Sequence, residues 1–263
     1  MSAAGASAAG AAGGIPGGLS PEAVMAVLRR VAETRPRVQC LTNTVAQAYT
    51  ANMLLAFGAV PSMASHVDEI GAMARGAGAV LINLGTISPD TAAAIPPLLA
   101  AVRESGRPLV LDPVFVELSP LRRHLAAEVM ALPELVVRGN AAEIAALSGE
   151  IAAAGSGATL VTTGAVDLID GPGGRHRSGH GHPLMAKVTA VGCAAGALIA
   201  ACCAVEDNRS LAAAAALTAY GIAGEIAATQ AKGPGSFAIA LIDALAGIDA
   251  AQLAAHMQEQ DAS

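Results

Sequence analysis

Short apolar runs alternate along this chain with longer segments in which apolar residues recur at helical spacing. The runs predict buried strands at residues 38–41, 61–64, 79–84, 108–111, 135–138 and 159–162. The longer segments predict helices at residues 21–33, 47–57, 68–75, 90–105, 121–132 and 141–147. Apolar strands that alternate with helices are typical of a mostly parallel sheet. The pattern therefore predicts an α/β fold, with a mostly parallel central sheet and helices on both faces.

The second half of the chain is organised around residues 183–203, where a run of small and polar residues leads into an apolar helix. A hairpin is predicted before it, at residues 167–179, and helices after it at residues 211–230 and 237–246. A helix start offers backbone N–H groups that lack intrahelical partners. Small residues at Ala190 and Gly192 would let an anion approach those donors. The alternative is an ordinary core helix whose preceding loop needs a glycine.

Composition narrows the possible partners and location. Hydrophobic residues make up 54% of the chain and aromatic residues only 2%, which predicts a helix-rich core of small residues. With a net charge of −6 and no basic block, nucleic acid and anionic membrane surfaces are not expected as partners. No uninterrupted apolar run reaches the roughly 18–20 residues of a membrane-spanning helix. Four cysteines without a CxxC motif fit reduced thiols in the cytoplasm.

The N-terminal residues differ from the rest of the chain. Residues 1–19 are a low-complexity run of Ala, Gly and Ser, without the charged and apolar regions of a signal peptide. We expect a disordered leader there. No internal repeat or linker divides the remainder, so residues 20–263 are predicted to form a single domain.

Polar side chains follow several predicted strands, at the sheet edge where ligands gather in α/β folds. Asp112 follows residues 109–111, and Asn140 and Glu143 lie one helical turn apart after the next strand. Oxygen ligands of this kind would suit Mg²⁺ and nucleotide phosphates. The alternative for Glu143 is a capping-box partner of Asn140.

Three further side chains carry possible chemistry. Arg138, at a strand end, offers a planar charged fork for a phosphate, or else an ordinary ion pair. Thr163 offers a hydroxyl at the next strand end, although such a threonine is often only structural. Cys193, at the predicted helix start, is expected to have a lowered thiol pKa. Its alternative role is that of a small buried hydrophobe.

Histidines at positions 176, 180 and 182 are spaced like metal ligands, but no cysteine or carboxylate nearby completes a tetrahedral set. A metal role for them is not expected. Neither a Walker A motif nor GxGxxG occurs, so the sequence gives no support to a P-loop or a Rossmann dinucleotide site.

Residues 181–193, GHPLMAKVTAVGC, resemble the GHPLxxKVTGTGC-type signature of the hydroxyethylthiazole kinases in the ribokinase-like superfamily. Six other segments resemble that family in the family's order and span most of residues 40–237: CLTNTVAQAYTANMLLAFGAVPSMA, LINLGTIS, LVLDPV, VVRGNAAEIAALSG, LVTTGAVD and KGPGSF. The resemblance implies a ribokinase-like fold. It also implies ATP- and Mg²⁺-dependent phosphorylation of the hydroxyl of 4-methyl-5-(2-hydroxyethyl)thiazole, in thiamine salvage or biosynthesis.

The resemblance also implies residue roles and an assembly. Cys193 would be the catalytic residue, where the wider superfamily has an aspartate base, and His182 belongs to the signature. The remaining roles are ATP binding by Arg138, Thr163, Asn140 and Gly192, substrate binding by Met63, Ala190 and Asn43, and magnesium binding by Asp112 and Glu143. The family resemblance further implies a homotrimer with its substrate site at the subunit interfaces.

The chain departs from the family pattern in three places. Ala190 replaces the first loop glycine of the signature, and Phe115 and Glu117 stand where the family has a glycine-rich DPVGxGA run. The connection from residue 149 to residue 160 is shorter than the family's, so a helix and part of the nucleotide-site wall are expected to be missing. Two alternatives follow: a kinase of another small alcohol, or a thiazole-binding relative that transfers phosphate poorly.

Overall fold

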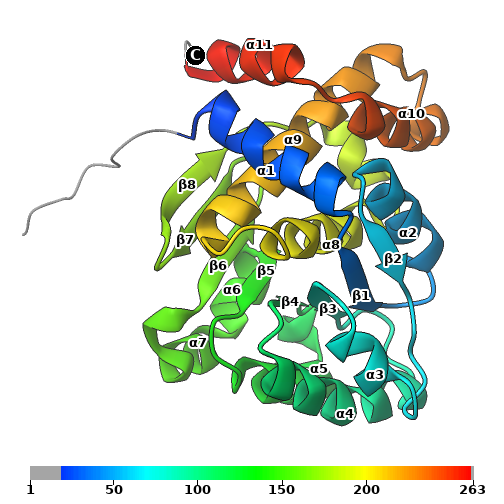
Figure 1. Cartoon of the computed structure of the whole chain (residues 1–263), viewed down its shortest axis with the longest axis vertical. Helices are drawn as coiled ribbons and strands as arrows, with labels where there is room; N and C mark the ends of the chain where they lie inside the picture. Colours follow the sequence, from blue (N-terminus) through cyan, green and yellow to red (C-terminus); the bar gives the residue numbers. More distant parts are fainter. Residues whose placement is uncertain (1–18, 262–263) are drawn as a thin grey trace, which may run out of the picture.

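The computed structural model describes residues 19–261, and nearly all of the predicted leader lies outside that range. Eight strands form one sheet in the order β2-β1-β3-β4-β5-β6-β7-β8 (Figure 1). Neighbours from β2 to β6 pair in parallel, whereas β6, β7 and β8 pair antiparallel. The strands are β1 (Arg37–Leu41), β2 (Val60–Ser62), β3 (Ala79–Asn83), β4 (Leu109–Asp112), β5 (Val136–Asn140), β6 (Thr159–Thr163), β7 (Asp167–Gly171) and β8 (Gly174–Ser178). The predicted α/β fold with a mostly parallel sheet is confirmed.

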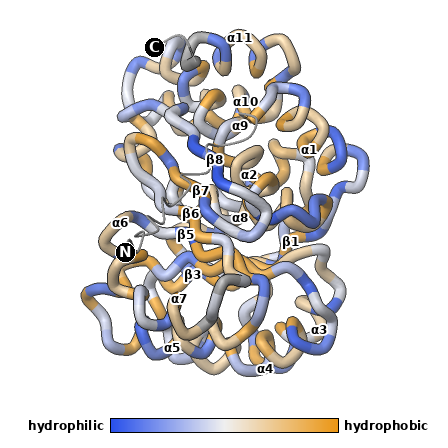
Figure 2. Tube along the Cα trace, turned by 90° about the vertical axis from the view of Figure 1, so that its left-hand side faces the viewer, coloured by the Kyte–Doolittle hydropathy of each residue, from blue (hydrophilic) through white to orange (hydrophobic). Residues whose placement is uncertain are grey.

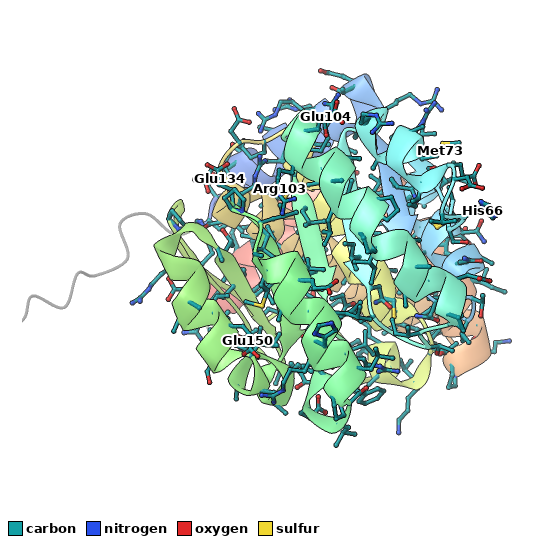
Figure 3. All side chains as sticks on the ribbon, turned by 90° about the horizontal axis from the view of Figure 1, so that it is seen from below. His66, Met73, Arg103, Glu104, Glu134 and Glu150 are labelled. Carbon is teal, nitrogen blue, oxygen red and sulfur yellow. The ribbon has the colours of Figure 1, made fainter. Side chains whose placement is uncertain are left out.

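Helices cover both faces of the sheet. One layer holds α1 (Pro21–Thr34), α2 (Gln47–Ala56), α8 (Val191–Cys203), α9 (Arg209–Gln230), α10 (Pro234–Gly247) and α11 (Ala250–Asp261). The other holds α3 (Ile70–Arg75), α4 (Pro89–Ser105), α5 (Pro120–Met130), α6 (Ala141–Ala146) and α7 (Ser148–Ala154). Figure 3 views this second layer from below, with charged side chains such as Arg103 and Glu104 on its outer surface. Short 3-10 turns lie at Val116–Leu118, Gly155–Gly157 and Pro183–Lys187.

Alternating strand residues feed two separate hydrophobic cores. In β3, Ala79 and Leu81 belong to the core beneath α8, while Val80 and Ile82 belong to the core of the opposite layer. All four side chains are completely buried, which is why the strand reads as a continuous apolar run. The apolar strands at the centre of the molecule stand out in Figure 2.

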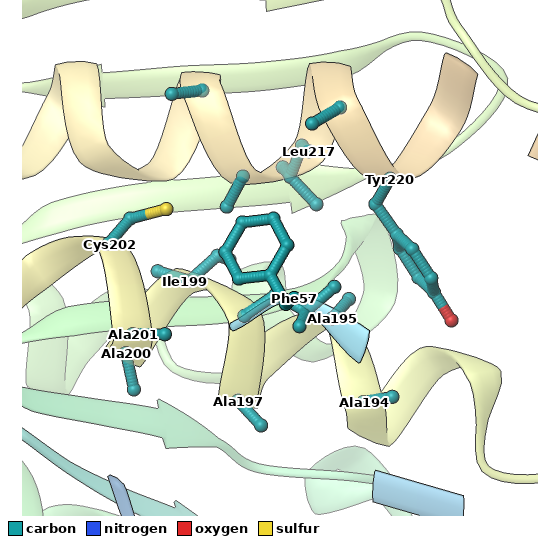
Figure 4. Packing of buried hydrophobic residues seen from close by; sticks show 14 of the residues in the cluster. Phe57, Ala194, Ala195, Ala197, Ile199, Ala200, Ala201, Cys202, Leu217 and Tyr220 are labelled. Atoms are coloured by element: carbon teal, nitrogen blue, oxygen red, sulfur yellow. The ribbon is translucent and has the colours of Figure 1, made fainter. Parts of the chain in front are cut away.

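The core around α8 and α9 is built largely from alanine, as the composition predicts. Figure 4 shows Ala194, Ala195, Ala197, Ala200 and Ala201 of α8 in this core, together with larger residues such as Phe57 and Tyr220. Small side chains let helices and sheet approach closely. A Cβ added at Gly196 would lie 3.1 Å from Leu81 Cδ1, so α8 packs directly on β3 at this position.

By length and apolar composition, α9 could cross a membrane, and so could the bent pair α10–α11. However, 78% of the most apolar window of α9 is buried inside the protein. The long apolar helix is therefore accounted for by core packing.

Two helices are absent from the predicted set. Helix α7 occupies the connection that was expected to lack a helix, and α11 follows the last predicted one. The segment that forms α7, SGEIAAA, has Ile151 as its one large apolar residue, and α11 has two, Met257 and the fully buried Leu253. Neither helix therefore has the apolar stripe on which such predictions depend.

Candidate active site

The amino end of α8 is the centre of the site. Ala190 precedes the helix in a left-handed conformation, with φ 70° and ψ −10°, and its carbonyl accepts the first helical hydrogen bond from Ala194 N at 2.8 Å. Val191, Gly192 and Cys193 form the first turn, whose N–H groups have no carbonyl partner within a helix. The predicted anion-binding stretch is thus a true helix start.

Two cavities lie on either side of this helix start. The larger, of about 640 Å³, is lined by Arg138, Thr163, Gly192 and Tyr220 among others. The smaller, of about 240 Å³, is lined by residues that include Asn43, Phe115, Arg122, Ala190 and Cys193. The structure thereby brings three of the four predicted nucleotide residues to one cavity. It brings two of the three predicted substrate residues, together with Cys193, to the other.

A buried polar cluster lies at the carboxyl ends of β3, β4 and β5. Asp112 Oδ2 accepts a hydrogen bond from Asn83 Nδ2 at 2.9 Å and lies 3.4 Å from Arg138 Nη1. The other carboxylate oxygen, Asp112 Oδ1, and the Nε of Arg138 are buried without a hydrogen-bond partner. A buried unpaired acceptor beside a buried unpaired donor suits a bound ligand that carries both a cation and an anion.

Burial raises the pKa of Asp112 to about 6. The charge of Arg138 acts in the opposite direction, the charge of Glu143 adds to the rise, and the hydrogen bond from Asn83 again lowers it. The carboxyl group therefore changes charge close to neutral pH, which is unusual for an aspartate.

The predicted lowering of the Cys193 pKa is wrong. Burial raises the pKa of this thiol and the nearby charge of Asp112 raises it further, while hydrogen bonds from Asn83 and Asn43 and the charge of Arg138 only partly offset the rise. Asn43 Nδ2 lies 3.8 Å from the sulfur. Since burial outweighs the donors around it, Cys193 is mainly a neutral thiol at neutral pH.

Asn140 and Glu143 form a complete capping box at the start of α6. The Asn140 side chain accepts from Glu143 N at 3.0 Å, and Glu143 Oε2 accepts from Asn140 N at 2.8 Å. Glu143 Oε1 accepts from Phe115 N at 2.8 Å, so each carboxylate oxygen already has a backbone donor. The capping interpretation describes this pair, and neither residue lines the two cavities. Their ATP and magnesium roles stay predictions.

The other predicted residues take up different positions. Thr163 lines the larger cavity, and its hydroxyl donates to Gly139 O at 3.3 Å. Met63 follows β2, packs against the hydrophobic core and lines neither cavity. Its substrate role stays a prediction, because Met63 does not lie at the helix start in this single chain.

The histidines do not form a metal site. Among residues 19–261, no group of three or more His, Cys, Asp or Glu side chains could hold a metal ion. His180 Nδ1 lies 3.1 Å from Glu225 Oε1, and His182 Nδ1 accepts from Leu184 N at 3.2 Å. These two side chains instead shape the loop that borders the larger cavity.

Two residues of the site were not predicted. Asn83 is fully buried and bridges the cluster, since its Oδ1 accepts from Asn43 Nδ2 at 3.1 Å while its Nδ2 donates to Asp112. The sequence signal that could have revealed Asn83 is a polar residue at the end of an otherwise apolar strand. Arg122 lines the smaller cavity, and nothing in its helical sequence context indicated this, because the loop before α5 determines its position.

The fold and the site together have the features of the ribokinase-like class: a mostly parallel sheet, a helix start between two cavities, and a buried Asp–Arg pair beneath it. A solved structure shares this fold. A ribokinase-like superfamily protein from Enterococcus faecalis has the same fold, with a TM-score of 0.63 at 15% identity over 86% of this chain and 94% of that one.

More similar proteins define the family. The hydroxyethylthiazole kinase family model matches residues 28–157 and 150–251. A hydroxyethylthiazole kinase of Granulibacter bethesdensis is 40% identical over 88% of this chain and 92% of that protein. One from Cereibacter sphaeroides is 43% identical over 84% and 92%. The structure of a hydroxyethylthiazole kinase protein from Pyrococcus horikoshii covers 87% of this chain and 94% of its own, with 35% identity and a TM-score of 0.81. The chain belongs to the hydroxyethylthiazole kinase family.

Proposed function

We propose that this protein transfers the γ-phosphoryl group of ATP to the hydroxyl of 4-methyl-5-(2-hydroxyethyl)thiazole, as a cytoplasmic enzyme of thiamine salvage or biosynthesis. The observation that carries the proposal is the pair of cavities that meet at the start of α8. Val191 and Gly192 line one, whereas Ala190 and Cys193 line the other. A phosphoryl group that passes from one cavity to the other would cross the helix start, where backbone donors favour negative charge.

ATP is assigned to the larger cavity. The Arg138 guanidinium lies beside Gly192, where an added Cβ would be only 3.6 Å from Arg138 Nη2. A phosphate that accepts from the Gly192 amide would therefore be within reach of the fork of Arg138 as well. Thr163, on the same wall, offers its hydroxyl oxygen to the nucleotide.

The acceptor alcohol is assigned to the smaller cavity, with its hydroxyl towards Cys193. In the transfer, the acceptor oxygen forms a bond to the γ-phosphorus, the bond from that phosphorus to the ADP oxygen breaks, and the hydroxyl loses its proton. Phosphoryl transfer is largely dissociative, so alignment and charge stabilisation contribute more than a strong base. A mainly neutral Cys193 thiol fits this balance: we propose that it orients the hydroxyl and assists deprotonation through its minor thiolate form.

Magnesium is the metal that the nucleotide would bring. Asp112 Oδ1 fits it, because this buried oxygen has no hydrogen bond of good geometry, although the Val114 backbone amide interacts with the carboxylate and lowers its pKa. Glu143 lies close enough to influence the Asp112 charge. When bound, Mg²⁺ neutralises phosphate charge. Asp112 would hold the ion while Arg138 fixes the position of the carboxylate.

We further propose one kinase domain over residues 20–263 and a homotrimer, as the family resemblance implies. Val45 lines the acceptor-side cavity although it is 62% exposed, which supports a site completed by another subunit. Light scattering should give the mass of three chains. A monomer at micromolar concentration would contradict the trimer.

The function is tested by ADP release from ATP–Mg²⁺ in the presence of the thiazole alcohol, with thermal shifts for each ligand alone. Turnover that depends on the thiazole, and stabilisation by both ligands, are the expected results. Stabilisation by nucleotide alone would favour a different acceptor. That alternative rests on Phe115, which departs from the family pattern and lines the acceptor-side cavity. Stabilisation by thiazole alone would indicate a binding protein.

A further inference from the structure

Phe115 lies in a strained segment between β4 and α5. Its φ of 55° and ψ of 33° place it in the left-handed region, where a bulky side chain is a genuine outlier. Such a conformation persists only when the surroundings fix it, and it is found mainly at functional sites. Here the Phe115 N–H donates to Glu143 Oε1 at 2.8 Å, so the capping residue of α6 holds the strained turn in place.

The Phe115 ring has a cation beside it. The Arg122 guanidinium carbon lies 6.0 Å from the ring centroid, within the range of a cation–π contact. Arg122 also donates to the carbonyl of Val114, the residue before Phe115, and its own N–H donates to Ser119 Oγ at 3.3 Å. The turn that carries the ring is therefore tied to α5 on one side and to α6 on the other.

The ring is nevertheless 55% exposed, and it borders the cavity that also contains Cys193 and Asn43. Glu117, the other bulky departure from the family pattern, lies on the exposed side of the turn and lines neither cavity. Phe115 belongs to neither hydrophobic core of the described chain, so its strained backbone is not explained by core packing. Its available face suits a flat ring of a ligand.

We propose that Phe115 is a specificity-determining residue that stacks on the flat heteroaromatic ring of the acceptor alcohol, with Arg122 behind it. This inference rests on the proposed function, because it takes the cavity beside Cys193 as the acceptor site. Aromatic pairing in a partly exposed site supports an effect of about 3- to 10-fold on acceptor affinity.

The test uses the full chain and four variants. Phe115→Tyr keeps a ring, Phe115→Leu keeps apolar volume without a ring, and Phe115→Gly removes both the ring and the backbone strain. Leu121→Ala is the matched control, since this neighbouring side chain is 51% exposed and lines neither cavity. For each protein, we would measure the KM of the thiazole alcohol, the KM of ATP, and the Kd of the thiazole alcohol by calorimetry without ATP.

The expected result is a thiazole KM and Kd that rise about 3- to 10-fold in Phe115→Leu and Phe115→Gly, with the ATP KM unchanged. Leu121→Ala should match the parent, and Phe115→Tyr, which keeps the ring, should lie closer to the parent than Phe115→Leu does. If the thiazole is phosphorylated but its KM and Kd are the same in all variants, the stacking role is wrong and the proposed function stands.

The binding measurement separates the two proposals further. If the thiazole alcohol binds in a Phe115-dependent way without being phosphorylated, the stacking role stands and the proposed function fails. If the parent neither binds nor phosphorylates it, both are wrong. Tighter thiazole binding by Phe115→Gly would also overturn the inference, because the ring would then be an obstruction.

Discussion

The two walls of the site are built in opposite ways. On the nucleotide side, helix α9 presents Gly221 and Gly224 to the loop at its surface: an added Cβ would lie 2.5 Å from His180 O and 2.6 Å from Met185 Sδ. At Gly221 the neighbour is backbone, so a larger side chain is excluded, whereas at Gly224 the Met185 side chain would have to move. On the proposed acceptor side, three residues that are not glycine hold left-handed backbone conformations: Ala190, Phe115 and Thr86, at φ 70°, 55° and 45°.

This difference separates the part of the site that phosphate chemistry constrains from the part that can vary. The nucleotide wall depends on close backbone approach and buried hydrogen bonds, so substitution there is costly. The proposed acceptor wall holds side chains at strained positions, and it leaves Phe115 exposed while Ala190 is buried. Acceptor preference can therefore change while the helix start and the Asp112–Arg138 pair remain.

The largest effect is expected from Arg138→Met, on the nucleotide side. This change removes the charged fork and leaves Asp112 buried without its cationic neighbour. We expect kcat/KM for ATP to fall about 10²- to 10³-fold while thiazole binding measured by calorimetry changes little. Arg138→Lys keeps a charge but not the fork, so its kcat/KM for ATP should lie between the values of the parent and of Arg138→Met. An equal loss of thiazole affinity would show that the two walls are not independent.

A smaller effect is expected from pH. Because the pKa of Asp112 in the metal-free protein is raised to about 6 from an ordinary 3.8, the carboxylate is lost as pH falls through about 6. A protonated Asp112 must release its proton before it can hold Mg²⁺, so turnover at limiting Mg²⁺ should drop about tenfold per pH unit below that point. The stability effect has the opposite sign: the folded state binds the Asp112 proton more tightly than the unfolded state. The contribution of protonated Asp112 to the free energy of unfolding is fully present below pH 3.8 and is lost as pH rises to about 6.

Paired pH–rate and pH–unfolding profiles of the parent and Asp112→Asn check both signs. In the variant, the Asp112-dependent step should disappear from each profile. If the parent's turnover at limiting Mg²⁺ keeps its full value a unit or more below pH 6, the assigned role of Asp112 is wrong.

Glu225→Gln should affect only the nucleotide side. One Glu225 oxygen accepts from Gly181 N at 3.0 Å and lies near His180, and the other lies 2.7 Å from His256 Nδ1 of α11. An amide cannot accept at both ends, so the loop that borders the larger cavity should loosen. We expect the ATP KM to rise about 3- to 10-fold, with the thiazole KM and kcat within twofold. A fall in kcat without a change in the ATP KM would contradict this positioning role.

The smallest effect is expected from Ala190→Gly, on the acceptor side. Glycine adopts the left-handed conformation without the Cβ penalty, so the variant should be more stable by about 1 kcal/mol, or roughly 2–4 °C in Tm. The amide remains, and turnover should stay within about twofold of the parent. Calorimetric unfolding measures the first quantity; a lower Tm would mean that Ala190 is not strained.

The sequence predicted the sheet and the site to different degrees. Strands such as β3 are apolar on both faces, and that property alone was enough to locate them along the sequence. Strand ends and a helix start singled out Arg138, Thr163 and Gly192, the family resemblance implied their nucleotide role, and the structure brings them to one cavity. The pKa of Cys193 could not be predicted, since it depends on burial and on Asp112, which lies far away in the sequence. Arg122 was missed for the same reason: a left-handed turn at Phe115 determines its position.

The central claim is that backbone donors at the start of α8, rather than the Cys193 thiol, carry most of the transfer. Turnover at saturating ATP and thiazole for Gly192→Pro, Gly192→Ala and Cys193→Ala tests it most directly. Gly192 is the second residue of α8, where proline is compatible with the helix but removes one amide. We expect Gly192→Pro to lose about 10²- to 10³-fold in turnover with an unchanged circular dichroism spectrum. Gly192→Ala, which keeps the amide, and Cys193→Ala should each lose about tenfold or less. Two results would contradict this claim. One is a folded Gly192→Pro that turns over as fast as Gly192→Ala; the other is a loss in Cys193→Ala as large as that expected for Gly192→Pro.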